Sequence, residues 1–414
     1  MTRINLKKRD ATKFETYSTA PKVSKLCHIL NRGEGEVNIL RRLIEVIIIL
    51  MMFNLSIGIF RFWNDTIKKI LAIKEINVAF FALCVQMTTT EVLPLCALVE
   101  SYCTNNIIFY YNENSEKQQK IRKERRVKLK RLEDVNIKFF MTLMGFSVLM
   151  PWLQSVYIVL KRNNYGDIQE LPFVLFSYYP EQYKSITLHA IIQTGYGVFL
   201  IINELQMYCI FTAMYMASQT LTDEFDLLVT CLEEIDANIR DYDLVRKHLK
   251  GDVDNVKHQS AYENKLQTFL SKIVDHHSSL YSNVEVMNRR ISSLCFATIN
   301  AFTFQLFTCV MCAIEMENLA TRVKYVFFIF FVGSLMILCA SIGQNISDKG
   351  EEVRNALCNC SWVDKPEWFK KSILIMLIRS SKPLVIMPFG LYVLDLKRLA
   401  VILNGIYSYF NVIY

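Results

Sequence analysis

The sequence predicts an all-α, polytopic membrane protein with seven transmembrane helices. Of its 414 residues, 52% are hydrophobic and 21% are charged, whereas an ordinary soluble domain carries about 25% charged residues. Mean hydropathy is +0.23, and the turn-forming residues are scarce, with 13 Gly and 8 Pro. This composition excludes a disordered chain, a collagen and a small secreted scaffold.

The transmembrane helices are predicted from apolar runs, since about 20 mainly apolar residues cross the roughly 30 Å hydrocarbon core of a bilayer. The runs lie at 43–60, 77–101, 138–160, 188–217, 291–313, 323–345 and 396–414. Polar residues interrupt several of them, namely Asn54, Gln86, Glu91, Glu100, Gln154 and Glu204. Because polar groups are costly in lipid, we expect these side chains to face protein or water, more often in bonds between helices than against a ligand or ion.

The orientation follows from Lys and Arg in the segments beside the runs. Residues 1–42 hold ten of these basic residues, and residues 112–134 hold nine. Two runs separate the two segments, so both lie on one side of the bilayer, which the positive-inside rule identifies as the cytoplasm. Seven spans then place the N-terminus in the cytoplasm and the C-terminus outside. Basic clusters that flank apolar runs indicate a lipid bilayer as partner, and no nucleic acid.

Residues 218–290 are predicted to be helical outside the bilayer. Apolar residues recur every three or four positions from Phe225 to Ile239, and again from Tyr262 to Leu280. This spacing is typical of amphipathic helices. They would continue the fourth and fifth spans into the cytoplasm, where their apolar faces need a partner in this chain or another.

No cluster of residues predicts catalysis. Cys309 and Cys312 form a CxxC pair inside an apolar run, where cysteine usually acts as a small buried hydrophobic residue. The Asp275-His276-His277 motif has no nucleophile nearby in sequence, and adjacent residues of a helix do not share a face. We therefore expect no enzyme, no metal site and no cofactor.

The C-terminal third carries motifs in an order typical of one family. They are Leu270…Asp275-His276…Leu280 before the fifth span, Gly350-Glu351 after the sixth, Trp362, the Arg379…Pro383 junction and the terminal Tyr407-Ser408-Tyr409-Phe410. In these motifs the chain resembles the insect odorant receptors. Because it lacks the long cytoplasmic insertion of the coreceptor that the family shares, it resembles a divergent ligand-tuning subunit.

The resemblance implies a ligand-gated, non-selective cation channel. This subunit and the odorant coreceptor would form a heterotetramer around one pore for permeating cations, in the plasma membrane of an olfactory sensory neuron dendrite. The ligand would be a small volatile odorant. The resemblance also implies a cytoplasmic anchor domain and a last helix split between that domain and the pore. The chain then divides into a cytoplasmic segment 1–42, spans one to four in 43–217, anchor-domain helices 218–290, spans five and six in 291–345, an anchor-domain segment 346–383 and a pore-lining segment 384–414.

The family binds odorants in the outer half of spans two, three, four and six. The residues that match this depth are Phe80, Phe81, Cys84, Ser147, Met150, Gln154, Tyr196, Leu200, Tyr325 and Phe328. An aromatic-rich pocket suits a small apolar volatile, because burial contributes about 25 cal/mol per Å² without directional bonds.

The pore residues are expected on the last helix. Asn404, Ser408 and Val412 lie four apart, on one stripe. Two polar groups and one apolar ring suit a wet pore with a hydrophobic constriction. By motif alignment with the family, Val412 takes the position of the gate. The alternative interpretation is a helix whose small polar residues serve packing.

Two other families stay open from the sequence. A gustatory receptor-type ligand-gated channel is a close relative, with a terminal signature that differs from Ser408-Tyr409-Phe410. A G-protein-coupled receptor also has seven helices, but it would have an outside N-terminus and an Asn-Pro-x-x-Tyr motif. This chain has Asn404-Gly405-Ile406-Tyr407 at the nearest match.

Overall fold

The computed structural model describes residues 21–30, 39–103, 116–161, 174–178, 185–248, 255–316, 319–363 and 365–413. All regular elements within these ranges are helical. They are α1 (Pro21–Leu30), α2 (Ile39–Arg61), α3 (Thr66–Thr88), a 3-10 turn (Thr89–Glu91), α4 (Val92–Cys103), α5 (Glu116–Met144), a π-helical turn (Gly145–Leu149), α6 (Met150–Lys161), α7 (Ile186–His248), α8 (Asn255–Glu315), α9 (Leu319–Asn359), α10 (Glu367–Ser380), a 3-10 turn (Pro388–Gly390) and α11 (Leu396–Ile413).

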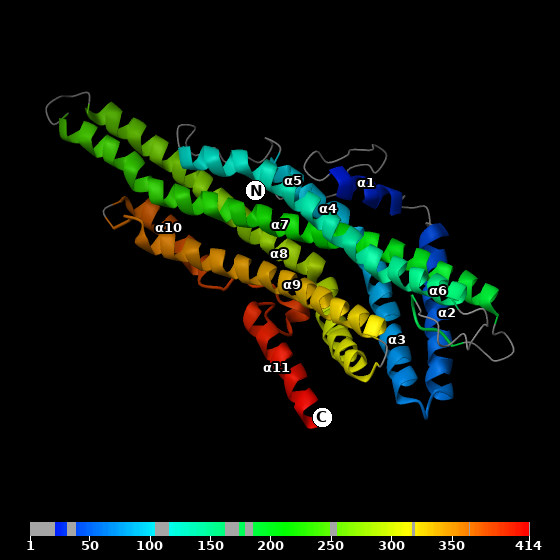
Figure 1. Cartoon of the computed structure of the whole chain (residues 1–414). Helices are drawn as coiled ribbons and strands as arrows, with labels where there is room; N and C mark the ends of the chain where they lie inside the picture. Colours follow the sequence, from blue (N-terminus) through cyan, green and yellow to red (C-terminus); the bar gives the residue numbers. More distant parts are fainter. Residues whose placement is uncertain are drawn as a thin grey trace.

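Three long helices form the frame of the molecule. α7, α8 and α9 run side by side along its length, with α5 beside α7 and α10 beside α9 (Figure 1). α2 and α3 pack together at the end of the molecule away from α10 (Figure 1), where α3 also contacts α8. α11 stands apart, touching α8 and α9, with the C-terminus at its tip (Figure 1). The amphipathic segments 225–239 and 262–280 are continuous with α7 and α8, as the spacing predicts.

Five stretches of helix, counted over the described residues, are long and apolar enough to cross a bilayer. They are Arg42–Arg61, Thr66–Cys103, Ile186–Ile235, Leu266–Glu315 and Thr321–Asn359. Two expected spans fall outside this set. The run 138–160 covers the end of α5, the π-helical turn and α6, so no single helix contains it. α11 carries Lys397, Arg398 and Asn404, which lower its mean hydropathy.

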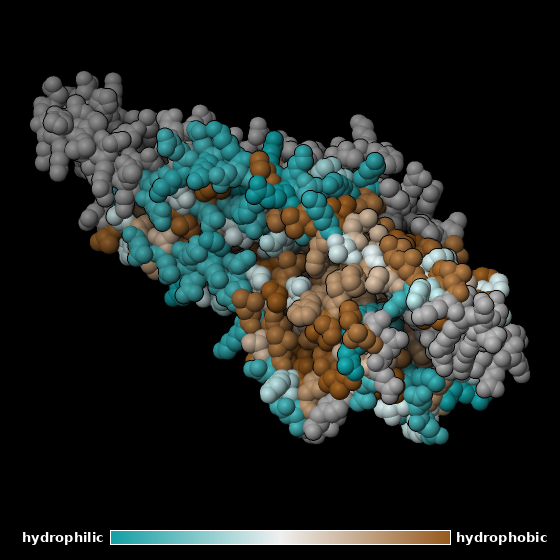
Figure 2. Space-filling model, in the orientation of Figure 1, coloured by the Kyte–Doolittle hydropathy of each residue, from teal (hydrophilic) through white to brown (hydrophobic). Residues whose placement is uncertain are grey.

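The outer surface divides into a hydrophilic and a hydrophobic part. Figure 2 shows hydrophilic residues over the upper left, where α5, α7 and α10 lie in Figure 1, and hydrophobic residues over the lower right. Large apolar side chains are exposed on the helices of this second part, among them Leu50 and Phe53 of α2 and Phe330 and Ile337 of α9. Such a surface suits contact with lipid.

Polar residues inside the apolar runs connect elements to one another. The Gln86 Nε2 atom of α3 donates to Gln206 Oε1 of α7 at 2.7 Å. Asn54 exchanges two hydrogen bonds of 3.1 Å with the backbone of Tyr178, and Arg290 pairs with Glu91 at 2.6 Å. These contacts confirm bonding between elements as the role of these three interruptions.

His276 and His277 of the Asp275-His276-His277 motif make polar contacts inside the helix bundle. Glu224 of α7 accepts from Arg125 of α5 at 2.5 Å and lies 2.9 Å from the His276 Nε2 atom of α8. Burial opposes the charge of Arg125, but the Glu224 carboxylate outweighs it and raises the pKa of the guanidinium. His277 lies 2.9 Å from the Ser380 hydroxyl of α10. Among the described residues, no group of His, Cys, Asp and Glu is placed to hold a metal ion.

The linker between α10 and α11, residues 381–395, contains the 3-10 turn Pro388–Gly390 and packs closely on α8 and α9. The backbone N–H of Met387 donates to Asn288 at 3.1 Å, and that of Phe389 donates to Ser292 at 2.7 Å. Gly343 of α9 lies so close to the linker that an added Cβ would stand 1.8 Å from the Leu394 carbonyl oxygen. Asp395 then caps the N-terminus of α11, because its side chain accepts from the Arg398 N–H at 2.6 Å.

Candidate ligand-binding cavity

A partly open cavity lies where α3, α5, α7, α8 and α9 meet. Its space for the centre of a water-sized sphere is about 100 Å³, which suits a small molecule. Its lining residues come from the five helices and the segment before α7. They are Lys74, Glu75, Asn77, Val78, Phe81, Leu143, Val174, Leu175, Leu200, Asn203, Glu204, Met207, Ala301, Phe302, Gln305, Lys324, Phe328, Phe331 and Val332.

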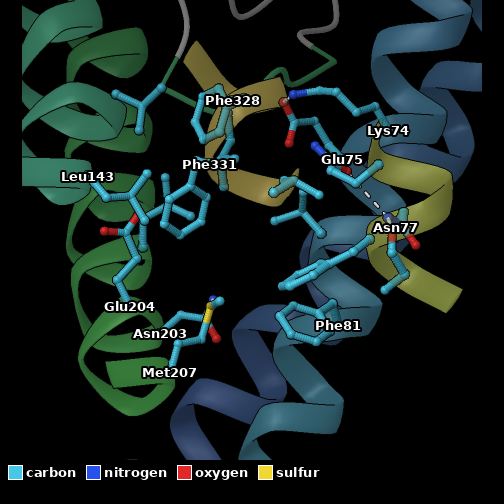
Figure 3. Close-up of a pocket in the computed structure, with 18 of the residues that line it drawn as sticks. Lys74, Glu75, Asn77, Phe81, Leu143, Asn203, Glu204, Met207, Phe328 and Phe331 are labelled. Atoms are coloured by element: carbon cyan, nitrogen blue, oxygen red, sulfur yellow. Dashed lines mark hydrogen bonds and ion pairs between the residues drawn. The ribbon is translucent and has the colours of Figure 1, made fainter. Parts of the chain in front are cut away.

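The walls of the cavity are mainly aromatic and aliphatic. Phe81 of α3 lies against Phe302 of α8, with ring centroids 4.8 Å apart. Phe328 and Phe331 enter from α9, and Leu143 closes the side formed by α5 (Figure 3). Apolar walls of this kind bind a ligand through burial of its surface, without directional bonds.

One rim of the cavity is charged. The Lys74 Nζ atom lies 2.7 Å from a Glu75 carboxylate oxygen, and both side chains are buried. The same ammonium group lies 5.2 Å from the centre of the Tyr325 ring. Asn77, one turn along α3, donates to the Ala301 carbonyl oxygen at 2.9 Å, which ties α3 to α8 beside the cavity. The Lys74–Glu75 ion pair and the hydrogen bond from Asn77 to Ala301 fix the position of this rim.

A second polar group lies across the cavity on α7. In Figure 3, Asn203 and Met207 face the open space from the side opposite Phe81. Asn203 is 5% exposed, and its Nδ2 atom lies 3.8 Å from the Met207 sulfur. Its side-chain oxygen makes no hydrogen bond within the described part of the chain.

The residues predicted from depth fall into three groups. Phe81, Leu200 and Phe328 line the cavity. Tyr325 is buried beside it against Cys309 and Cys312, whose CxxC pair thus belongs to a hydrophobic cluster. Five further predicted positions do not line it: Phe80 and Met150 are exposed, Tyr196 packs in a neighbouring core, and Cys84 and Gln154 are half-buried. The side chain of the last, Ser147, lies outside the described residues.

Several lining residues were not predicted from the sequence. Lys74 and Glu75 precede the second apolar run, and Asn203 interrupts the fourth. A signal existed for Asn203, because an amide in an apolar run must find a partner. α8 also contributes Ala301, Phe302 and Gln305, although the fifth span was not expected at the site.

The predicted pore residues lie apart from the cavity. Asn404 and Ser408 of α11 are exposed, and the Ser408 hydroxyl donates to the Asn404 carbonyl oxygen at 2.8 Å. The side chain of Val412 lies outside the described residues. α11 meets α8 through Phe307, whose ring centre is 5.9 Å from that of Tyr409 and 5.6 Å from that of Phe410. α8 therefore contacts both the cavity and the last helix.

Comparison with known families gives one match over most of the chain. The model described as "7tm Odorant receptor" matches residues 77–407. These residues include the lining of the cavity except for Lys74 and Glu75. Of the families weighed from the sequence, the match is thus to the odorant receptors.

Curated relatives and solved structures agree with this match. Odorant receptor 10 of Aedes albopictus is 24% identical over 156 residues, covering 37% of this chain and 41% of the relative. Odorant receptor Or2 of Anopheles gambiae is 22% identical over 144 residues, covering 35% of this chain and 38% of the relative. The matched region thus spans about two fifths of each relative.

The fold matches over nearly the whole chain. The olfactory receptor OR5 from Machilis hrabei has a TM-score of 0.70 at 13% identity, covering 94% of this chain and 96% of that one. The same receptor in complex with eugenol gives a TM-score of 0.68 at 14% identity. At such identities the likeness shows a shared fold.

Proposed function

Because this chain belongs to the 7tm odorant receptor family, we propose that it is a ligand-tuning subunit of an odorant-gated, non-selective cation channel. The observation that carries the proposal is the phenylalanine-walled cavity between helices inside the matched region. A small volatile odorant fills this cavity, and its binding opens the pore. The structural relative OR5 was solved in complex with eugenol, a small molecule, which supports this ligand class.

The proposed topology has seven transmembrane helices, with the N-terminus in the cytoplasm and the C-terminus outside the cell. The basic segments 1–42 and 112–134 support this orientation. The two further spans beyond the five stretches named above are α5 to α6 and α11. Residues 218–290 and 346–383 form the cytoplasmic anchor domain. The receptor itself lies in the plasma membrane of an olfactory sensory neuron dendrite.

The subunit assembles with the odorant coreceptor as a heterotetramer. α10 supports this proposal, because its side chains Leu374, Ile375 and Ile378 are apolar and exposed. The helix lies on the side of the molecule where the surface is largely hydrophilic (Figures 1 and 2). Apolar area exposed to water gains the full hydrophobic effect on association, whereas helices in lipid gain little. We propose this α10 face as a contact between subunits.

The pore is lined by α11. Asn404 and Ser408 present polar groups to a wet passage, and Val412 forms the apolar constriction that resists wetting when narrow. Val412→Ser should lower the cost of wetting the closed pore. Cells that express this variant with a coreceptor should show a raised current without ligand or an altered ion selectivity, while ligand potency changes less. A change in ligand potency alone would contradict the pore assignment.

The test of the whole proposal is a current recording. Cells expressing the chain with a coreceptor should pass cation current when exposed to at least one member of a panel of volatiles. Cells expressing the coreceptor alone, or an unrelated tuning subunit with it, serve as controls for the response. A chain that reaches the surface and adds no response to any volatile would overturn the proposal.

A further inference from the structure

The asparagine side chain on the α7 side of the cavity lacks a strong hydrogen-bond partner among the described residues. Asn203 is 5% exposed and lines the cavity. Its Oδ1 atom makes no hydrogen bond within the described residues, and its Nδ2 atom lies 3.8 Å from the Met207 sulfur. A thioether is a weak acceptor. The whole amide is therefore poorly satisfied, and it faces an open space.

Such an amide is unusual in a folded interior. Buried polar side chains are nearly all hydrogen-bonded, and one that lacks a partner calls for an explanation. Phe81, Phe302 and Met207 of the wall are apolar, and none of the described polar lining residues bonds to the Asn203 Oδ1 atom. The space beside Asn203 admits a small molecule. A ligand that enters it is in a position to supply the missing bond.

The chemistry of the amide defines the ligand group. An asparagine side chain offers two acceptor sites on its oxygen and two donors on its nitrogen. A hydroxyl group both donates and accepts, so it complements the amide in either orientation. An ether oxygen or a hydrocarbon cannot donate to Oδ1.

The structure thus points to an alcohol. Resting on the function proposed above, we propose that the cavity selects a small aliphatic or aromatic alcohol, whose hydroxyl bonds to Asn203 while its body packs against Phe81, Phe302 and Phe328. Glu75 also has a carboxylate oxygen without a hydrogen bond, but its other oxygen is engaged by Lys74 at 2.7 Å. Asn203 faces the aromatic wall from the opposite side (Figure 3).

Isomeric ligands test this preference without a change in size. Benzyl alcohol and anisole share one formula, as do 1-octanol and heptyl methyl ether. The purified full chain in lipid nanodiscs should bind each alcohol about tenfold more tightly than its ether, read from the ligand-dependent rise in Tm. The ethers partition better into apolar space, so a preference for the alcohols requires a polar partner in the cavity.

Asn203→Leu locates that partner. The variant keeps a side chain of similar size, so it should still bind the ethers, and the preference for the alcohols should fall to within about twofold. Its Tm without ligand should not fall, because the poorly satisfied amide is gone. Phe81→Leu is the matched control, since it should weaken alcohol and ether alike. A preference that survives Asn203→Leu would overturn the assignment.

The result also separates this inference from the proposed function. Wild-type protein that binds alcohol and ether equally, and loses both with Phe81→Leu, would overturn the role of Asn203 and leave the odorant site standing. Wild-type protein that binds neither pair nor any other volatile would overturn both.

Discussion

The two halves of α7 pack in opposite ways. Residues 208–235 form the packed half, where Tyr208, Phe211 and Phe225 have almost no exposed surface. Residues 186–207 form the cavity half, which lines the cavity with Leu200 and Asn203 and exposes Ile191 at 64% on its outer side. One continuous helix therefore packs against a filled core along residues 208–235 and borders the cavity along residues 186–207. We therefore expect the packed half to contribute most to stability, and we propose that the cavity half recognises the ligand.

The largest loss of stability is expected in the packed half. Phe225 is fully buried, and its ring packs edge-on against Tyr281 with centroids 6.1 Å apart. Phe225→Ala should cost about 3–5 kcal/mol, because it removes buried apolar contacts and leaves a void. Thermal unfolding of the purified protein measures this loss. A Tm close to that of the wild type would show that the packed half does not dominate stability.

The second-largest loss of stability is expected where the linker before α11 contacts α9. Gly343→Ala places a methyl group 1.8 Å from the Leu394 carbonyl oxygen, so the linker must move. We expect a cost of about 1–3 kcal/mol from this overpacking, together with altered gating. Gly333→Ala on the same helix is the matched control, because its Cβ would meet nothing within 4 Å. Equal free energies of unfolding and equal gating in the two variants would contradict the close contact between Gly343 and the linker.

The α10 face should matter for assembly and hardly at all for the fold of the single chain. Ile375 is 66% exposed, so Ile375→Asp should change the free energy of unfolding by no more than about 0.5 kcal/mol. Co-purification with a tagged coreceptor should be lost, whereas Ile375→Leu should retain it. Unchanged co-purification of the Asp variant would place the subunit contact elsewhere.

Sequence patterns predicted the helices better than they predicted the cavity. The three- and four-residue spacing from Phe225 to Ile239 gave the extension of α7, because burial along one face requires that period. Phe81, Leu200 and Phe328 were predicted from depth and line the cavity. Asn203 was missed, since a lone amide in an apolar run is equally consistent with a helix-to-helix bond, the role that Gln86 has. Which role an amide takes depends on the packing of five helices, which no local pattern contains.

The boundaries of the membrane spans also could not be predicted from local sequence patterns alone. Gly145–Leu149 is a π-helical turn. This turn changes the backbone hydrogen bonding but not the composition, so the sequence 138–160 still looks like one apolar run. The expected number of spans and their orientation stay predictions. Lys74 and Glu75 lie before the apolar run of α3, so an estimate of depth from run boundaries left them out of the site.

The most direct test of the account compares two phenylalanines on α9. Phe328 lines the cavity, and Phe330, two residues away, is 73% exposed on the surface assigned to lipid. Currents should be recorded from cells that express each Ala variant with a coreceptor, over a range of concentrations of an activating volatile. Phe328→Ala should raise the half-maximal concentration about tenfold or abolish the response, with little change in current without ligand, while Phe330→Ala should behave like the wild type. Equal responses of the two variants, at equal surface expression, would contradict the claim that this cavity is the odorant site.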